Sequence, residues 1–142
     1  MNECRLWDPL IEQNSTGCRH LCLPDAGSLN FDKSHVDACA DRLKAKGLPQ
    51  QLMVDASHGN SEKDYRNQPA VIADLCTQIA DGSKAVASIM IESNIIEGAQ
   101  KLGDDPSKLV YGQSVTDQCI SWQSTEDVID ALSVAVKARR AL

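Results

Sequence analysis

Three short apolar runs, each separated from the next by enough chain for one helix, constrain this sequence more than any other feature. The runs are HLCL at 20–23, QLMV at 51–54 and AVASIMI at 85–91, and they are nearly continuous in apolar or small residues. A continuous run of this length is typical of a parallel strand that is covered on both faces. The runs start about 31 and 34 residues apart, which is the length of a strand-helix-strand unit. The sequence therefore predicts an α/β fold around a parallel sheet.

Helices are predicted from apolar residues at helical spacing and from start and stop signals. The stretches with these features are 34–47, 67–82 and 124–142. Ser34 with Asp37, and Ser124 with Asp127, have the spacing of a capping box at a helix N-terminus. The faces predicted to be buried comprise Val36, Cys39, Ala40 and Leu43 in the first helix, Val71, Ile72, Leu75, Cys76 and Ile79 in the second, and Val128, Ile129, Leu132 and Val136 in the third.

The size and charge of the chain fit one globular domain and exclude some classes of protein. Its 142 residues, 42% of them hydrophobic, are enough for one core. A formal net charge of −6 disfavours a surface for nucleic acid or for an anionic membrane. No apolar stretch has the length of a membrane span, and the N-terminus MNECRLWDPL lacks an apolar signal core. We therefore expect a cytoplasmic protein whose six cysteines are thiols rather than disulfides.

Polar side chains follow two of the predicted strands and recur in a third polar segment. His58 comes after QLMVD, Glu92 comes directly after AVASIMI, and Asp117 lies in YGQSVTDQCISW. Residues just beyond the carboxyl ends of parallel strands meet at one rim of the fold. One imidazole and two carboxylates suit a divalent manganese, iron or zinc ion. Asp55 and Ser57, beside His58, are candidates for orienting the imidazole. Each of these residues could instead have an ordinary role in a loop, a turn or a helix cap.

A second metal pattern lies earlier in the chain. Cys18, Cys22, His35 and Cys39 are spaced C-x3-C-x12-H-x3-C, which is within the range of zinc sites. Cys39, however, also belongs to the apolar face of the first predicted helix, where a thiol packs as a small hydrophobic group. A small zinc-binding module is therefore kept as an alternative.

From Asn30 to its C-terminus the chain resembles the C-terminal part of the class I DAHP synthases (3-deoxy-7-phosphoheptulonate synthases, also called phospho-2-dehydro-3-deoxyheptonate aldolases). The segments that carry the resemblance are KGLPQQLMVDASHGNSEK, ADLCTQIADGSKAVASIMIESNIIEG, LVYGQSVTDQCISW and the terminal VKARR. Several motifs occur in the family's order over most of the last 110 residues or so.

The resemblance implies a transferase of the shikimate pathway to the aromatic amino acids. It implies a TIM (β/α)8 barrel, of which this chain would form about the last three βα units, and the condensation of phosphoenolpyruvate with erythrose 4-phosphate. The family holds a divalent metal with a cysteine, a histidine, a glutamate and an aspartate. The last three carry over to His58, Glu92 and Asp117.

The chain also departs from the family pattern. Residues 1–29 form a divergent N-terminal segment, and 30–142 form the barrel-like part. The family's cysteine ligand and most of its phosphate-binding side chains come from strands that are not found here, and Pro24 stands where the family has a phosphate-binding arginine. We therefore expect a truncated protein that binds metal weakly and is inactive alone. The alternatives are a subunit that completes a barrel with a separate N-terminal chain, a homo-oligomer, or a small non-catalytic protein.

Overall fold

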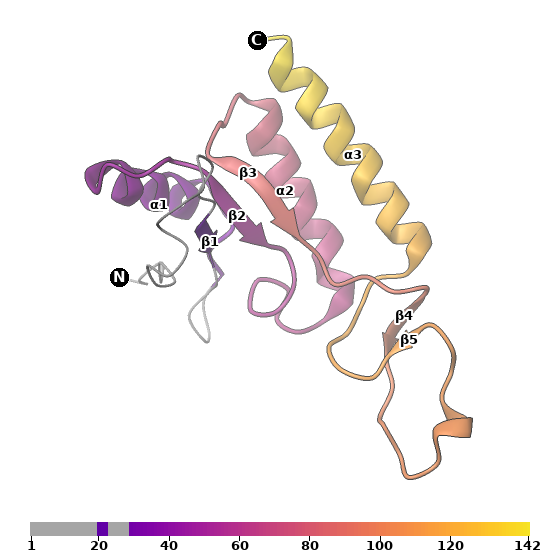
Figure 1. The fold of residues 1–142 in the computed structure, drawn as a ribbon. Helices are drawn as coiled ribbons and strands as arrows, with labels where there is room; N and C mark the ends of the chain where they lie inside the picture. The colour runs from indigo at the N-terminus through magenta and orange to yellow at the C-terminus, as the bar shows by residue number, and fades with distance from the viewer. Residues whose placement is uncertain (1–19, 23–28) are drawn as a thin grey trace.

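The computed structural model describes residues 20–22 and 29–142, and it contains the predicted parallel sheet (Figure 1). The strands are β1 (His20–Cys22), β2 (Leu52–Asp55) and β3 (Val86–Met90), in the spatial order β1-β2-β3. Both neighbouring pairs are parallel. The α/β prediction is therefore confirmed. β1 and β3 lie inside the apolar runs that predicted them, and β2 extends one residue beyond its run, to Asp55.

Three helices account for most of the remaining regular structure. They are α1 (Lys33–Ala45), α2 (Gln68–Ala80) and α3 (Trp122–Arg140). Their positions agree with the prediction, but the predicted capping boxes at Ser34 and Ser124 are wrong. Asp32 caps α1 by accepting a hydrogen bond from the Ser34 backbone N–H, and Ser121 caps α3 by accepting one from the Ser124 backbone N–H. Each predicted cap therefore lies inside the first turn of its helix.

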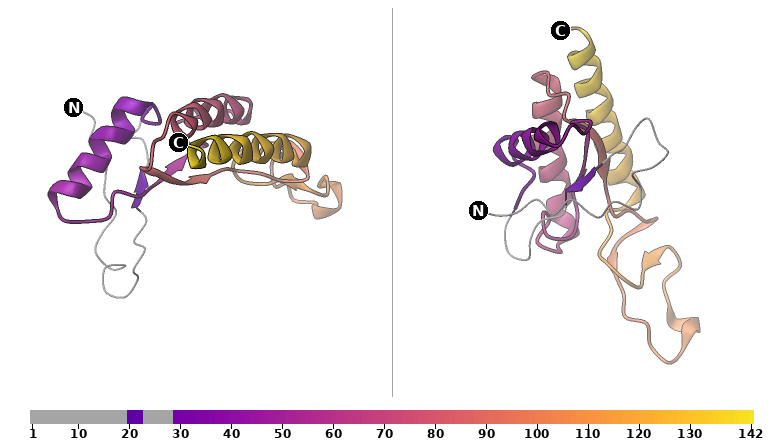
Figure 2. Two further views of the ribbon diagram at one scale, coloured as in Figure 1. Left: turned by 90° about the horizontal axis from the view of Figure 1, so that it is seen from above. Right: turned by 60° about the vertical axis from the view of Figure 1, so that its left-hand side comes forward.

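The core lies between the sheet and the apolar faces of the helices. Helices α2 and α3 run side by side (Figure 2). The buried cluster comprises Val36, Cys39, Leu43, Leu52, Val54, Ala56, Val71, Ile72, Leu75, Ile79, Val86, Ile120, Val128 and Ala135. Four predicted buried positions differ from the structure, because Ile129 is exposed and three are only half-buried against the core, namely Cys76, Leu132 and Val136. In α3 the predicted Val128 is buried together with Thr125 and Ala135, so the buried face is turned away from Ile129.

Residues 94–120, called the arm here, project away from the sheet and helices (Figures 1 and 2). The arm contains a separate two-stranded parallel sheet of β4 (Ile96–Ala99) and β5 (Gln113–Ser114), and a short 3-10 helix, η3 (Pro106–Lys108). Its two ends are joined at the base, where the Ile120 N–H donates to the Glu92 carbonyl at 2.9 Å and the Asn94 N–H donates to the Ile120 carbonyl at 3.0 Å. This closure brings the end of the arm back to the end of β3.

Among the described residues, no helix combines the length and the apolar character needed to cross a membrane.

Candidate metal centre

His58 is held at the end of β2 by a buried carboxylate. Asp55 is fully buried, and its Oδ1 accepts a hydrogen bond from the Ser57 N–H at 2.8 Å. Its Oδ2 lies 2.8 Å from Nδ1 of His58. Since a carboxylate accepts, Nδ1 carries the proton in the neutral ring, and Nε2 presents its lone pair on the opposite side. The backbone of His58 is left-handed, with φ of 40°.

The loop after His58 is tied back to the sheet and to the chain before α1. Nδ2 of Asn60 donates to the Asp55 carbonyl at 2.8 Å, and the Asn30 N–H donates to Oδ1 of Asn60 at 2.9 Å. The Lys63 N–H donates to the His58 carbonyl at 2.8 Å. These bonds fix the backbone that carries the imidazole.

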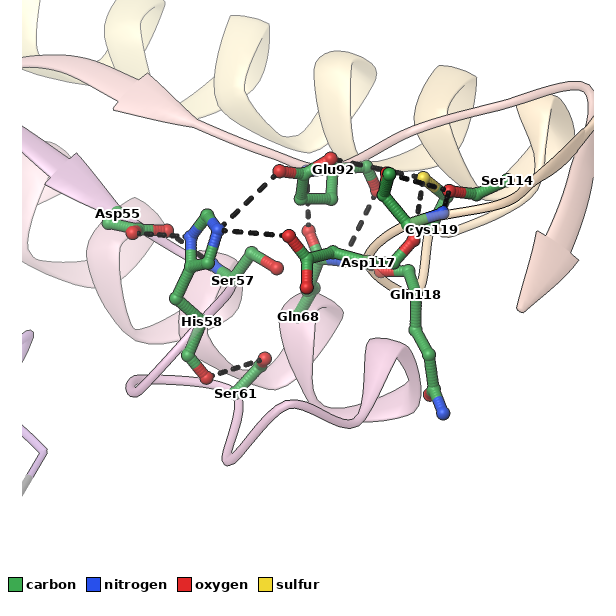
Figure 3. Close-up of polar contacts among 11 residues, drawn as sticks. Asp55, Ser57, His58, Ser61, Gln68, Glu92, Ser114, Asp117, Gln118 and Cys119 are labelled. Atoms are coloured by element: carbon green, nitrogen blue, oxygen red, sulfur yellow. Dashed lines mark hydrogen bonds and ion pairs between the residues drawn. The ribbon is translucent and has the colours of Figure 1, made fainter. Parts of the chain in front are cut away.

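Glu92 and Asp117 face Nε2 of His58 (Figure 3). Oε1 of Glu92 lies 3.6 Å from Nε2, and Oδ2 of Asp117 lies 3.7 Å from it. One possible donor atom from each of the three residues lies within 4.8 Å of the others. The side chain of Glu92 is 31% exposed and that of Asp117 is 62% exposed, so the site opens to solvent on the Asp117 side. It is the one group of this kind within residues 29–142.

The donor set fits a divalent cation. An imidazole nitrogen and two carboxylate oxygens from separate loops can each supply one ligand, and the two negative charges would be balanced by a doubly charged ion. A histidine whose other ring nitrogen is hydrogen-bonded to a carboxylate is the usual arrangement of a metal-binding histidine in proteins.

Two buried neighbours of the site were not found from the sequence. Gln68, the first residue of α2, is fully buried and hydrogen-bonds the backbone at Glu92. Sγ of Cys119 lies 3.9 Å from Oε2 of Glu92. Burial, together with the nearby carboxylates of Glu92 and Asp117, raises the pKa of the Cys119 thiol. The one sequence feature that points to Cys119 as a neighbour of the site is its position two residues after Asp117. For Gln68 the only such feature is its place directly before Pro69.

The zinc pattern is described only in part. Of the four residues in this pattern, Cys18 and the side chain of Cys22 lie outside the described residues. Pro24, which stands where the family has an arginine, lies outside them as well. Cys39 belongs to the hydrophobic core. Nδ1 of His35 lies 2.5 Å from Oδ2 of Asp32. Among the described residues, His58 belongs to a group of three possible metal ligands and His35 does not.

Comparison with known proteins shows that the chain is similar to a class of proteins named as aldolases. The chain is 40% identical over 131 residues to the Phe-sensitive phospho-2-dehydro-3-deoxyheptonate aldolase of Escherichia coli K12, covering 92% of this chain and 37% of that protein. It is 44% identical over 120 residues to the Tyr-sensitive enzyme of the same organism, covering 84% of this chain and 34% of that one. The chain therefore spans little more than a third of the length of these relatives.

A solved structure and a family profile agree with this class. The structure of phospho-2-dehydro-3-deoxyheptonate aldolase from Francisella tularensis SCHU S4 superposes with a TM-score of 0.73 at 44% identity, covering 78% of this chain and 31% of that one. The profile of the DAHP synthetase I family matches residues 12–130. The chain belongs to the DAHP synthetase I family, as the sequence resemblance indicated.

Proposed function

We propose that this chain supplies the metal-binding part of a DAHP synthase active site, where phosphoenolpyruvate condenses with erythrose 4-phosphate. The observation that carries the proposal is the meeting of His58, Glu92 and Asp117 within 4.8 Å at the ends of separate elements. Family membership supports the same reaction, because the relatives are named for it. Manganese or iron is the cation we expect at this site.

In this proposal each residue has a distinct task. A divalent ion bound here would act as a Lewis acid on the aldehyde carbonyl of erythrose 4-phosphate. Asp55 holds the proton of His58 on Nδ1, so that Nε2 stays available as a ligand. Glu92 and Asp117 contribute negative charge, and the exposed side of Asp117 leaves room for substrate to approach. Ser57 orients Asp55 through its backbone N–H.

We further propose that the sheet and helices correspond to the last three βα units of a (β/α)8 barrel, and that activity depends on residues beyond these 142. The chain covers 37% of its E. coli K12 relative, and the remaining strands of such a barrel would supply further ligands and phosphate-binding groups. Those strands could come from a separate N-terminal chain that pairs with this one. The metal affinity of this chain alone is then expected to be weak.

Metal binding tests the site without relying on activity. Mn²⁺ binding is measured by electron paramagnetic resonance for the wild-type chain and for His58→Ala and His35→Ala. His35 is a matched control, because its Nδ1 also contacts an aspartate. We expect His58→Ala to lose binding and His35→Ala to retain it. Equal binding by wild type and His58→Ala would contradict the site. Zinc binding that is lost in His35→Ala but kept in His58→Ala would favour the zinc module.

Complementation tests the reaction. The chain is mixed with a fragment of a related DAHP synthase that carries the N-terminal strands, and consumption of phosphoenolpyruvate is followed by its ultraviolet absorbance in the presence of erythrose 4-phosphate and Mn²⁺. We expect no turnover by the chain alone, turnover by the mixture, and none by the mixture that contains His58→Ala. Turnover by the chain alone would refute the need for other residues. A mixture that is inactive although the two chains co-elute would support the non-catalytic alternative.

A further inference from the structure

The three candidate ligands come from three separate loops, and one buried side chain reaches two of these loops. Gln68 is fully buried at the first position of α2. A fully buried glutamine must satisfy two donor hydrogens and one acceptor oxygen, or it destabilises the fold. The identity of its partners therefore shows what this residue is used for.

The side-chain amide of Gln68 hydrogen-bonds backbone groups of the loops that carry Glu92 and Asp117 (Figure 3). Its Oε1 accepts from the Glu92 N–H at 3.0 Å, and its Nε2 donates to the Glu92 carbonyl at 3.2 Å. The same Nε2 donates to the carbonyl of Gln118, next to Asp117, at 3.5 Å. Because both polar groups of one amide are engaged, Gln68 fixes the Glu92 backbone in position and orientation, and links it to the Asp117 loop.

Neighbouring residues connect the start of α2 to the third loop. Nδ2 of Asn67 donates to the carbonyl of Ser61, in the loop that follows His58, at 3.0 Å. The Tyr65 N–H donates to Oε1 of Gln118 at 3.3 Å, which adds a second link to the Asp117 loop. The segment from Tyr65 to Gln68 thus contacts all three ligand loops.

We propose that Gln68 is a positioning residue for the metal centre, which holds Glu92 and Asp117 opposite His58 before a cation binds. This inference rests on the proposed function of the site. Two carboxylates held near each other repel, and loops that were free to separate would relieve that repulsion. Loops held in place by a buried amide keep the ligands at binding distance, so less ordering is needed when the ion arrives.

The test compares two buried glutamines of the same helix. Gln78 is also buried, but its Nε2 donates to the Phe31 carbonyl and to Asp74, away from the metal centre. Mn²⁺ affinity of the full chain is measured by electron paramagnetic resonance for wild type, Gln68→Met and Gln78→Met, and is expressed per folded molecule after thermal unfolding of each variant. We expect both variants to lose stability. Only Gln68→Met should lose metal affinity, by about tenfold.

The outcomes separate this inference from the proposed function. If His58→Ala abolishes Mn²⁺ binding and Gln68→Met leaves it unchanged, the positioning role is refuted and the site stands. If His58→Ala leaves binding unchanged, the site itself is refuted. An equal loss of affinity in Gln78→Met would also overturn the inference, because the effect would then be one of general stability.

A measurement on the wild-type chain covers the case in which Gln68→Met does not fold. Amide hydrogen exchange without metal should show the Glu92 N–H protected to the same degree as the core amides of α2, since its acceptor is a fully buried side chain. Exchange of the Glu92 N–H as fast as that of exposed arm amides would show that Gln68 does not hold this loop.

Discussion

The sheet region, which comprises β1–β3 and the helices α1–α3, differs in construction from the arm, although both contribute to the proposed site. The side chains of the sheet region that carry the fold are buried between β2, β3 and the helices. The arm instead exposes large apolar side chains, among them Ile95, Ile96, Leu102, Val110, Tyr111 and Val115. His58 comes from the first region and is fixed by the buried Asp55, whereas Asp117 comes from the end of the arm and is largely exposed. The comparison indicates that the buried side chains of the sheet region carry the stability, whereas the arm contributes Asp117 to the proposed site from near its closed base.

The largest effect should follow from a core truncation in the sheet region. Leu75→Ala removes a fully buried side chain of α2 and leaves a cavity, so we expect the free energy of unfolding to fall by about 2–5 kcal/mol. Urea denaturation followed by circular dichroism measures this change. A loss below about 1 kcal/mol would show that the core is not the source of stability.

A change at Asp55 should impair the site through a residue that is not itself a ligand. In Asp55→Asn one oxygen becomes an NH₂ group, so the side chain cannot accept from both the Ser57 N–H and Nδ1 of His58. At the proposed site we expect Mn²⁺ affinity to fall by about 10–100-fold. Isothermal titration with Mn²⁺ checks this, with Asp74→Asn on the exposed side of α2 as the control. Unchanged affinity in Asp55→Asn would mean that the imidazole needs no support from the sheet region.

The cap of α1 should contribute moderately to the free energy of unfolding, and this contribution should depend on pH. Partial burial raises the pKa of Asp32, but hydrogen bonds from Ser34 and His35 outweigh it and lower that pKa to about 2. Because the folded-state pKa is below that of the unfolded chain, the carboxylate stabilises the fold above about pH 4, and this contribution is lost as pH falls through about 2. Asp32 is about half exposed, so solvent screening reduces the charge contribution.

Two substitutions separate the cap from its charge. Asp32→Ala should cost about 1 kcal/mol at neutral pH, whereas Asp32→Asn keeps a capping oxygen and should cost less. Unfolding by urea is measured from about pH 5 to about pH 2, and the difference between wild type and Asp32→Asn should narrow as the pH falls. A difference that stays constant over this range would show that the charge of Asp32 does not stabilise α1.

The smallest effect should come from the arm. Leu102→Ala is chemically the same substitution as Leu75→Ala, but Leu102 is 67% exposed. We expect the free energy of unfolding to change by less than about 0.5 kcal/mol. The same urea titration measures it. A loss comparable to that of Leu75→Ala would break the distinction between the two regions.

The regular elements were predictable because they rest on local patterns. Continuous apolar runs located β1, β2 and β3, and helical spacing located the three helices. The predicted cap of α1, Ser34, lies two residues after the true cap, Asp32. The predicted cap of α3, Ser124, lies three residues after the true cap, Ser121. The true caps do not match the capping-box pattern, because His35 and Ser124 stand three residues after them, so the pattern selected residues inside the first turn.

The polar interior was harder to predict. His58, Glu92 and Asp117 were selected because residues beyond the carboxyl ends of parallel strands meet at one rim, and the structure brings the three together. It could not find Gln68 or Gln78, because a buried glutamine depends on partners from distant segments such as Glu92 and Phe31. The short strands β4 and β5 were also missed, since β4 is mostly exposed, β5 consists of two polar residues, and neither carries a continuous apolar run.

The left-handed backbone of His58 would set folding and the proposed metal binding in opposition at one position. A φ of 40° is unfavourable for a residue with a Cβ, by about 1 kcal/mol, and glycine would relieve that strain while removing the imidazole. If His58 binds a cation as proposed, selection for that ligand would keep a strained residue in place. Gene copies released from that selection should drift toward glycine or asparagine at this position, so its identity across many genomes would serve as a record of which copies still handle a cation.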